Sequence, residues 1–317
     1  MLIPDATTND FGIFGTSHLH LNDRNDIQIG LRYDHRAIKG DKTGIANEEG
    51  YIPALNRDFN SFNAALGYKV NFLDNLVTRI NLATGFRAPN LAELTSNGVH
   101  EGTNRFEIGN ADLKNEQNLQ TDVALEFKNE HFEIFVNGFY NAINNYVFIA
   151  PNGEEIAGNQ VFVYNQQNAY LYGGEAGIHI HPHPLDWLHF ESSFQTVTGK
   201  LKNNSNLPLI PASSVTNTLR AEFSKKNDWL KNSYSFITLK SVFKQDNIST
   251  FETMTAGYNL LNVGLGGSIS LFNMAMDLRI SGNNLLDKNY VSHLSRLKYD
   301  GIGNIGRNIS LGISVPL

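Results

Sequence analysis

Two groups of side chains in this sequence have the chemistry of a transition-metal site. The first combines His100, Glu101 and Glu107 in one irregular stretch. Imidazole and carboxylate groups both bind divalent transition-metal ions, so the three residues are candidate ligands. Arg105 lies in the same stretch and is a further candidate for ligand binding. The alternative that we favour is that these residues make ordinary hydrogen bonds within a loop.

The second group is a run of histidines that begins with His179 and His181 and continues with His183 and His189. Because successive side chains of a strand point to opposite faces, His179, His181 and His189 share one face on either side of a short turn. They are possible metal ligands. Packing against a neighbouring segment is the alternative that we favour.

No other motif in the sequence indicates enzymatic chemistry. The stretch from Gly301 to Gly306 matches G-x-G-x-x-G, but a strand follows it, whereas the dinucleotide motif needs a helix whose amino end meets phosphate. The sequence has no G-x-S-x-G elbow, zinc-protease helix or phosphate loop. We therefore expect no catalysed reaction and no resident cofactor.

The elements that must position these groups are strands. From Arg307 to Leu317 apolar residues alternate strictly with small or polar ones, which predicts a half-buried strand with one bulky apolar face. The same period recurs along the chain and predicts about 13 strands. Short turns alternate with long loops, such as 37–58, 87–118 and 148–167. Connections that are short at one end of the strands and long at the other are typical of a membrane barrel. A soluble sandwich has little reason for this regularity.

Composition agrees with such a barrel. No apolar run approaches the ~18 residues of a spanning helix, and there is no cysteine. The formal net charge of -6 gives no nucleic-acid signature. Met1 to Asp5 have no basic region and no apolar core of a secretory signal, so an exported protein would need one upstream.

Two motifs carry a family resemblance. The carboxyl-terminal one contains Asn284, Leu285, Asp287, Tyr290, Gly306 and Arg307. It closely resembles the end of TonB-dependent outer-membrane receptors. The internal one opens with an FRAP-type start and closes with a GN-x-x-LK-x-E end, and it resembles that family's conserved loop; its residues are Phe86, Arg87, Pro89, Glu93, Gly109, Asn110, Leu113 and Glu116.

The resemblance implies an all-β fold, an antiparallel transmembrane up-and-down β-barrel in the outer membrane of a Gram-negative bacterium. Members of this family carry a globular plug domain and a barrel of about 22 strands. We therefore expect residues 1–317 to be a carboxyl-terminal fragment of the barrel without the plug, whose first strand pairs with a missing one. An odd strand count and an open edge in lipid agree with this expectation.

The resemblance also implies a function. The complete receptor would import a metal, a metal chelate (siderophore) or haem, with energy from the TonB complex, which would contact the missing amino-terminal region. Other implied partners are outer-membrane lipid, the barrel-assembly machinery and a small metal-containing ligand, with no nucleic acid. Two alternatives stay open: a passive outer-membrane channel, and a secreted all-β binding module or hydrolase with a sandwich core.

Site residues follow from the same resemblance. The stretch around His100 is similar to the histidine-rich loop of outer-membrane zinc receptors. Glu93 and Glu116 would lie near the base of the conserved loop, where Arg87 could fix it. His179 and His181 would lie inside the barrel at its periplasmic end, far from incoming substrate, which favours packing or contact with the plug.

Overall fold

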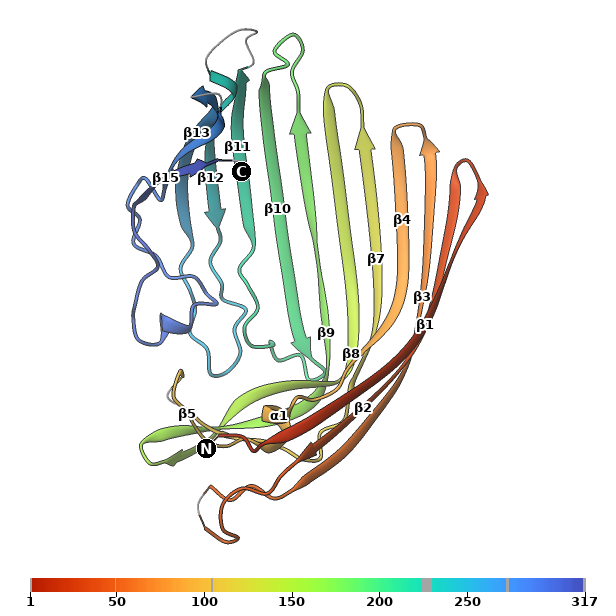
Figure 1. Cartoon of the computed structure of the whole chain (residues 1–317), viewed down its shortest axis with the longest axis vertical. Coiled ribbons are helices and arrows are strands. Elements are labelled where there is room, and N and C mark those ends of the chain that lie inside the picture. Colours follow the sequence, from red (N-terminus) through yellow and green to blue (C-terminus); the bar gives the residue numbers. More distant parts are fainter. Residues whose placement is uncertain (1, 49, 104, 224–229, 272–273, 316–317) are drawn as a thin grey trace.

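A single curved antiparallel wall forms the molecule (Figure 1). The computed structural model describes residues 2–315 except 49, 104, 224–229 and 272–273. Within these residues the sheet has fifteen strands; β5 and β6 lie off the main order, and the other thirteen follow one another in sequence. The count confirms the prediction. The bounds are β1 Ala6–Asn22, β2 Asn25–Gly40, β3 Leu55–Leu73, β4 Leu76–Arg87, β5 Asn97–His100, β6 Arg105–Ile108, β7 Glu116–Lys128, β8 Phe132–Ile156, β9 Asn159–Ile180, β10 Leu188–Leu201, β11 Ser214–Phe223, β12 Leu230–Val242, β13 Tyr258–Leu271, β14 Met274–Asn283 and β15 Asn308–Ser314.

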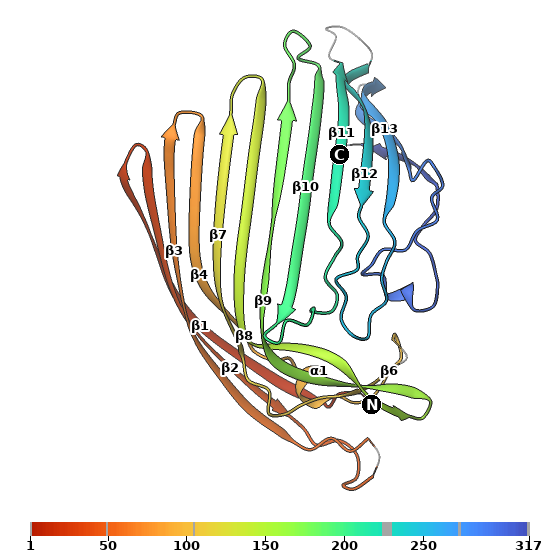
Figure 2. The ribbon, with the colours of Figure 1, turned by 180° about the vertical axis from the view of Figure 1, so that it is seen from behind.

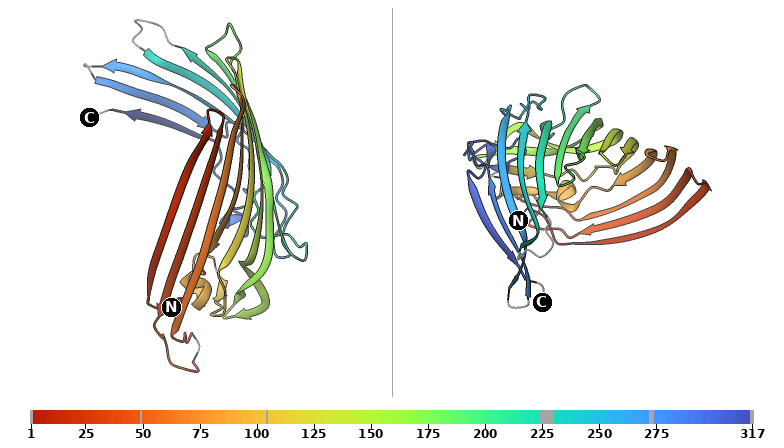
Figure 3. Two further views of the ribbon diagram at one scale, coloured as in Figure 1. Left: turned by 90° about the vertical axis from the view of Figure 1, so that its right-hand side faces the viewer. Right: turned by 90° about the horizontal axis from the view of Figure 1, so that it is seen from above.

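Alternating side chains give the wall one covered face and one exposed face. Along β3, Leu55, Phe59 and Ser61 are buried, whereas Phe62 and Leu66, of the opposite parity, are exposed. The exposed apolar residues line up across strands, as in the rows Leu66–Leu82, Leu219–Ile237 and Leu265–Ile280–Leu311. The wall is one layer rather than two stacked sheets (Figure 3). A single layer with outward apolar rows is the arrangement expected in lipid.

The two ends of the wall differ as the sequence predicts. The connections at 23–24, 74–75, 129–131 and 181–187 are short and gather at the upper end in Figure 1, here called the short-turn end. The segments 41–54, 88–115, 202–213, 243–257 and 284–307 gather at the lower end, here called the long-loop end. Within the described residues, β1 and β15 are the two edges of the wall.

Three boundaries differ from the sequence prediction. The expected loop 148–167 is instead a hairpin, because β8 and β9 continue past the wall and turn at Ala157 and Gly158, both with positive φ. Pro151 and Gly153 resemble a turn in sequence, but an irregular register between Pro151 and Glu155 absorbs them. The expected loops 37–58 and 87–118 are likewise shortened by β2 and β3 and interrupted by α1 (Leu91–Thr95), β5 and β6.

Other expectations fall partly outside the described residues. Three of the predicted features lie outside the described residues: Leu317, the turn at 272–273 and most of the turn at 225–231. The short 3-10 helix η1 (Arg296–Lys298) lies in the last long segment. Among the described residues, no helix is both long enough and apolar enough to span a bilayer.

The hydrophobic cores lie at the long-loop end, where the segments fold over the wall. One cluster joins β2, β3, β8 and the segment 88–115; its buried members are Ile38, Leu55, Phe59, Ala88, Leu94, Leu113 and Val147. A second joins β9 and β10 to the segment 202–213 through Ala169, Leu201, Leu207 and Ile210. Figure 2 shows α1 and β6 together at this end, so packed structure is concentrated there.

The outward position of Leu82 gives the first prediction. Replacing Leu82 near the middle of β4 with lysine puts a charge on the lipid face, which costs about 2–4 kcal/mol at the bilayer midplane. We expect Leu82→Lys to lower the unfolding free energy by that order in a urea titration in lipid vesicles. The control is Asn81→Lys, on the opposite face of the same strand, which should change it little. Equal losses would contradict the assignment of faces.

Candidate functional site

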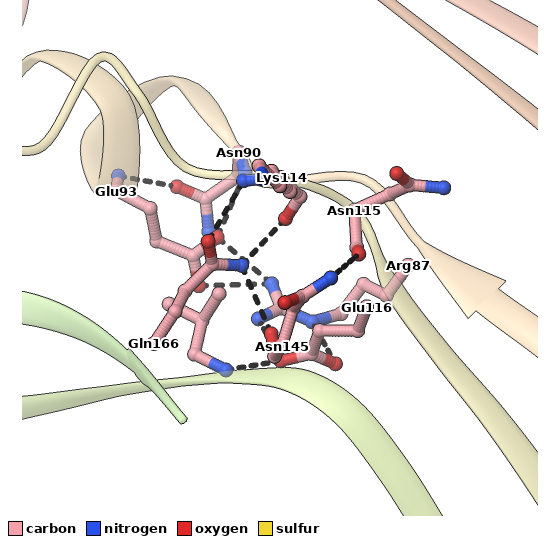
Figure 4. A network of polar contacts seen from close by, with 9 residues as sticks. Arg87, Asn90, Glu93, Lys114, Asn115, Glu116, Asn145 and Gln166 are labelled. Carbon is pink, nitrogen blue, oxygen red and sulfur yellow. Dashed lines mark hydrogen bonds and ion pairs between the residues drawn. The ribbon is translucent and has the colours of Figure 1, made fainter. Parts of the chain in front are cut away.

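Arg87 anchors the segment 88–115 against the wall (Figure 4). Its Nε and Nη2 donate to the two oxygens of Glu116 at 2.9 and 2.7 Å, and its Nη1 donates to both oxygens of Glu93 at 2.8 Å. Both carboxylate side chains are only 12% exposed. Glu116 also accepts from the Val147 amide at 2.7 Å. The structure thus places Arg87 with the two carboxylates that the sequence analysis paired with it.

Glu93 has a second role at the start of α1. Its Oε2 accepts from the Asn90 amide, and the Asn90 side chain accepts from the Glu93 amide, both at 2.9 Å. This capping box satisfies amide donors that a short helix leaves open. Gly109 lies against the end of α1, where a Cβ would come within 2.6 Å of the Thr95 and Ser96 backbone. Only glycine therefore fits there.

The remaining motif residues close the same segment. Asn110 accepts from the Asp112 amide at 2.9 Å and forms a turn. Leu113 is 1% exposed and packs with Phe86 in the first hydrophobic cluster, and Pro89 is fully buried. The internal motif thus holds the segment 88–115 against the wall, and its charged residues Arg87, Glu93 and Glu116 pair with one another.

The carboxyl-terminal motif closes the segment 284–307 in a similar way. Asn284 bonds both backbone groups of Lys288, and Asp287 accepts from the Arg307 amide at 2.9 Å. Gly306 lies beside Asp287, where a Cβ would approach its oxygen to 3.0 Å. Leu285 donates its amide to the Leu261 carbonyl, and Tyr290 packs on Tyr258 at 4.4 Å between ring centroids. These contacts hold the two ends of a 24-residue connection together.

The β5–β6 hairpin brings His100 and Glu107 together. His100 Nδ1 lies 3.1 Å from Glu107 Oε1, and the Tyr164 hydroxyl donates to Glu107 Oε2 at 3.1 Å. Glu107 is 6% exposed, whereas the His100 side chain is 45% exposed. Glu101 lies in the exposed turn and makes no side-chain hydrogen bond among the described residues. The stretch therefore supplies a pair of candidate ligands rather than three.

Arg105 is held by aromatic rings from other segments. Its guanidinium lies 4.3 Å from the ring centroid of Phe162 and 5.9 Å from that of Tyr299. Phe162 meets Phe251 edge-on at 6.1 Å, and the Tyr299 hydroxyl donates to the Phe251 carbonyl at 3.4 Å. β6 runs parallel to β9 here, which brings Arg105 beside Phe162. Across the described part of the chain, Arg105 forms no ion pair.

Sequence reasoning missed these aromatic partners. Phe162, Phe251 and Tyr299 come from three segments that are far apart in the chain. No local period links them, because the parallel β6–β9 pairing and the loop packing that join them are long-range contacts.

Glu252 and His293 form a buried pair that the sequence also did not reveal. The two side chains are 4% and 3% exposed, and His293 Nε2 lies 3.6 Å from Glu252 Oε1. His293 Nδ1 lies 2.8 Å from the Thr255 hydroxyl. Glu252 accepts from the Leu209 amide at 2.8 Å. Three long segments thus meet at one carboxylate and one imidazole.

His179, His181 and His189 cluster at the short-turn end. Candidate ligand atoms of the three residues all lie within 4.8 Å of one another. Of the residues that the structure describes, only this group and His18, His20 and Asp26 bring three possible metal ligands so close together. Strand alternation predicts the three histidines on one face, and the structure brings them together there from β9, β10 and the turn between them.

A family model for the TonB-dependent receptor-like β-barrel matches residues 2–285. The chain belongs to the TonB-dependent receptor family. Members of this family are outer-membrane β-barrel proteins of Gram-negative bacteria, and the wall described here is part of such a barrel. The ferrienterobactin receptor of Escherichia coli (strain K12) is 24% identical over 190 residues, which cover 56% of this chain and 23% of that protein.

Solved structures show the same fold. The copper transporter OprC superposes with a TM-score of 0.81 at 18% identity, over 98% of this chain and 49% of that one. The FrpB iron transporter of Neisseria meningitidis gives 0.69 at 16% identity, over 98% and 46%. The TonB-dependent receptor chain described here thus spans about half the length of these transporters.

Removing the cation of the Arg87 cluster should release the segment 88–115 of this receptor chain. Arg87→Ala leaves two nearly buried carboxylates without a partner. Breaking a buried pair costs about 3–5 kcal/mol, and we expect the lower end because the Arg87 side chain is 41% exposed. Hydrogen exchange of residues 91–113 should accelerate accordingly. Arg79→Ala, which removes the Arg79–Glu126 pair of the wall, should leave that exchange unchanged. Unchanged exchange in Arg87→Ala would contradict the anchoring role.

Acid should loosen the Glu252–His293 contact of the receptor. Burial lowers the pKa of His293, the Lys298 ammonium lowers it further, and Glu252 opposes the shift. The neutral form is therefore favoured while the loops are packed. Opening raises the pKa towards about 6.5, so this contribution to stability is present above that pH and is lost as pH falls below it. Hydrogen exchange of 249–255 should accelerate between pH 7.5 and 5.5, and less so in His293→Gln. An equal acceleration in both proteins would contradict it.

Proposed function

We propose that this chain forms part of the wall of an outer-membrane importer that takes up a metal chelate with energy from TonB. Family membership supports the transport class. The observation that carries the ligand class is Arg105, a cation without an ion-pair partner in the described part of the chain, held against Phe162 and Tyr299 at the long-loop end. A cation beside aromatic rings suits a negatively charged chelate with aromatic groups.

The relatives bear on the same ligand class. One bears the name of a ferrienterobactin receptor, and one solved structure is that of the ferric-catecholate import receptor Fiu of Escherichia coli K12. Catecholate groups are aromatic and carry negative charge when they bind iron. His100 and Glu107 lie in the same hairpin as Arg105, and His100 pairs with Arg105 in its register. We propose them as further contacts to the chelate or its metal. Zinc remains the ion suggested by the resemblance of this hairpin to a zinc-receptor loop.

The complete importer contains more than this wall. The free backbone groups of β1 and β15 cannot face lipid, because each unpaired group costs several kcal/mol in a bilayer. We infer that residues 1–317 are the carboxyl-terminal part of a barrel of about 22 strands, which closes on further strands and surrounds a plug domain. TonB contacts that remaining part, and the barrel-assembly machinery inserts the whole.

Two alternatives make different predictions. A secreted binding module needs its apolar rows covered, but Leu66, Leu265 and Leu311 are 50%, 52% and 67% exposed on a single-layered wall. A passive channel would leave the lumen open and would not need TonB. We propose that no reaction is catalysed, since transport in this class moves the ligand without chemical change.

Arg105→Ala is the variant that tests ligand binding. Loss of one charged contact, worth about 1.5–3 kcal/mol, should weaken binding of a ferric catecholate roughly 10- to 100-fold. The complete protein encoded by the gene is expressed in a strain that lacks its own catecholate receptors. Binding of radiolabelled chelate to whole cells is then measured. Arg296→Ala removes an exposed cation from the outer segment 284–307 and is the matched control.

The same cells distinguish import from passive diffusion. Uptake should stop in a strain that lacks TonB, while binding at the cell surface persists. Uptake that continues without TonB would identify a passive channel. Binding that is equal in Arg105→Ala, Arg296→Ala and the unchanged protein would refute the proposed chelate contact.

A further inference from the structure

Histidines are concentrated at the short-turn end of the wall. Seven of the ten histidines lie in or near its turns: His18, His20, His131, His179, His181, His183 and His189. Three of these form one cluster, on the covered face of β9 and β10 and in the turn between them. His179 lies across from Glu133 and Glu191 in the register, and His189 lies across from Arg220. The cluster is flanked by strands on both sides.

The geometry of the cluster is that of ligands around one ion. Ring centroids of His179 and His181 are 4.0 Å apart, those of His181 and His189 4.6 Å, and those of His179 and His189 5.4 Å. His179 Nε2 lies 3.3 Å from His189 Nδ1. Two nitrogens that bind one tetrahedral zinc at about 2.0–2.1 Å are about 3.3 Å apart. The observed separation therefore needs little adjustment to admit the ion.

Few hydrogen bonds compete for the nitrogens of these three rings. Within the described residues, their only ring hydrogen bond joins His179 to His189. The remaining ring nitrogens are available as ligands, and one metal ion can bind three neutral imidazoles at once.

The surrounding charges favour a cation. Glu191 Oε1 lies 3.8 Å from His179 Nε2, and Glu222 Oε2 lies 3.9 Å from His189 Nε2. Carboxylates at the edge of a histidine site orient the rings and raise their basicity. Arg220 is the nearby opposing charge, but it bonds Glu222 at 2.9 Å and lies over the Tyr234 ring at 5.0 Å. Its charge is thus partly balanced.

We propose that His179, His181 and His189 bind a divalent transition-metal ion with the ligand preference of zinc, with water or a carboxylate in the fourth position. The site lies at the end of the wall opposite to Arg105 and His100. Metal binding at this site does not depend on the proposed import function.

Cobalt is the probe for this site, because tetrahedral Co²⁺ absorbs visible light and zinc displaces it. The protein as its gene encodes it is purified in detergent and titrated with Co²⁺, then with Zn²⁺. We expect saturable absorption at one equivalent that zinc abolishes. His179→Gln with His189→Gln should weaken Co²⁺ binding by more than the roughly 10- to 100-fold typical of losing a supporting residue.

Controls decide where the ion binds. His18→Gln with His20→Gln changes the other histidine pair at the same end and should leave the Co²⁺ absorption intact; loss in that variant instead would overturn the assignment. Absence of saturable absorption in the unchanged protein would also overturn it. Circular dichroism checks that each variant keeps its sheet.

The metal site and the import function can be refuted independently of each other. Intact Co²⁺ binding with no chelate uptake refutes the import function and leaves the site. Intact uptake with no Co²⁺ binding refutes the site and leaves the import function.

Discussion

Backbone pairing without water is the constraint on which this structure depends. A strand in hydrocarbon must give every amide and carbonyl to a neighbouring strand, and its side chains must alternate between lipid and lumen. The rows that run through Leu66 and Leu82, and through Leu265, Ile280 and Leu311, are the direct result. Because the wall itself contributes little buried core, order at the long-loop end comes from the segments that fold over it.

Charged and polar groups fasten those segments where a soluble protein would use a larger core. Arg87 joins the end of β4 to α1 and to the start of β7 through two carboxylates, and Glu252 with His293 joins three other segments. Such pairs contribute geometry more than net stability, because desolvation offsets much of their attraction. Arg105, Phe162 and Tyr299 lie at the same end of the wall, where β6 pairs with β9. The recognised motifs therefore hold the segments of that end in place, and the candidate ligand contacts belong to the same segments.

The sequence predicted the periodic part of the molecule and missed the long-range part. Thirteen wall strands, their faces and the Arg87 cluster followed from alternation and from motifs whose residues are near each other in the chain. The hairpin of β8 and β9 beyond the wall was not predicted, because the irregular register between Pro151 and Glu155 that lets the strands continue has no local signal. The partners of Arg105 and the pair Glu252–His293 could not be predicted, because they come from segments that only the folded loops bring together. His100 and Glu107 were named together because one hairpin contains both.

The parallel pairing of β6 with β9 has an evolutionary consequence. Arg105, Phe106, Glu107 and Ile108 are paired with β9 residue by residue, in register with 160–163. Main-chain bonds of this kind accept almost any side chain. Substitutions at exposed positions of this hairpin, such as His100, can therefore leave it attached to the wall. The hairpin can vary in sequence over evolution at small cost to assembly.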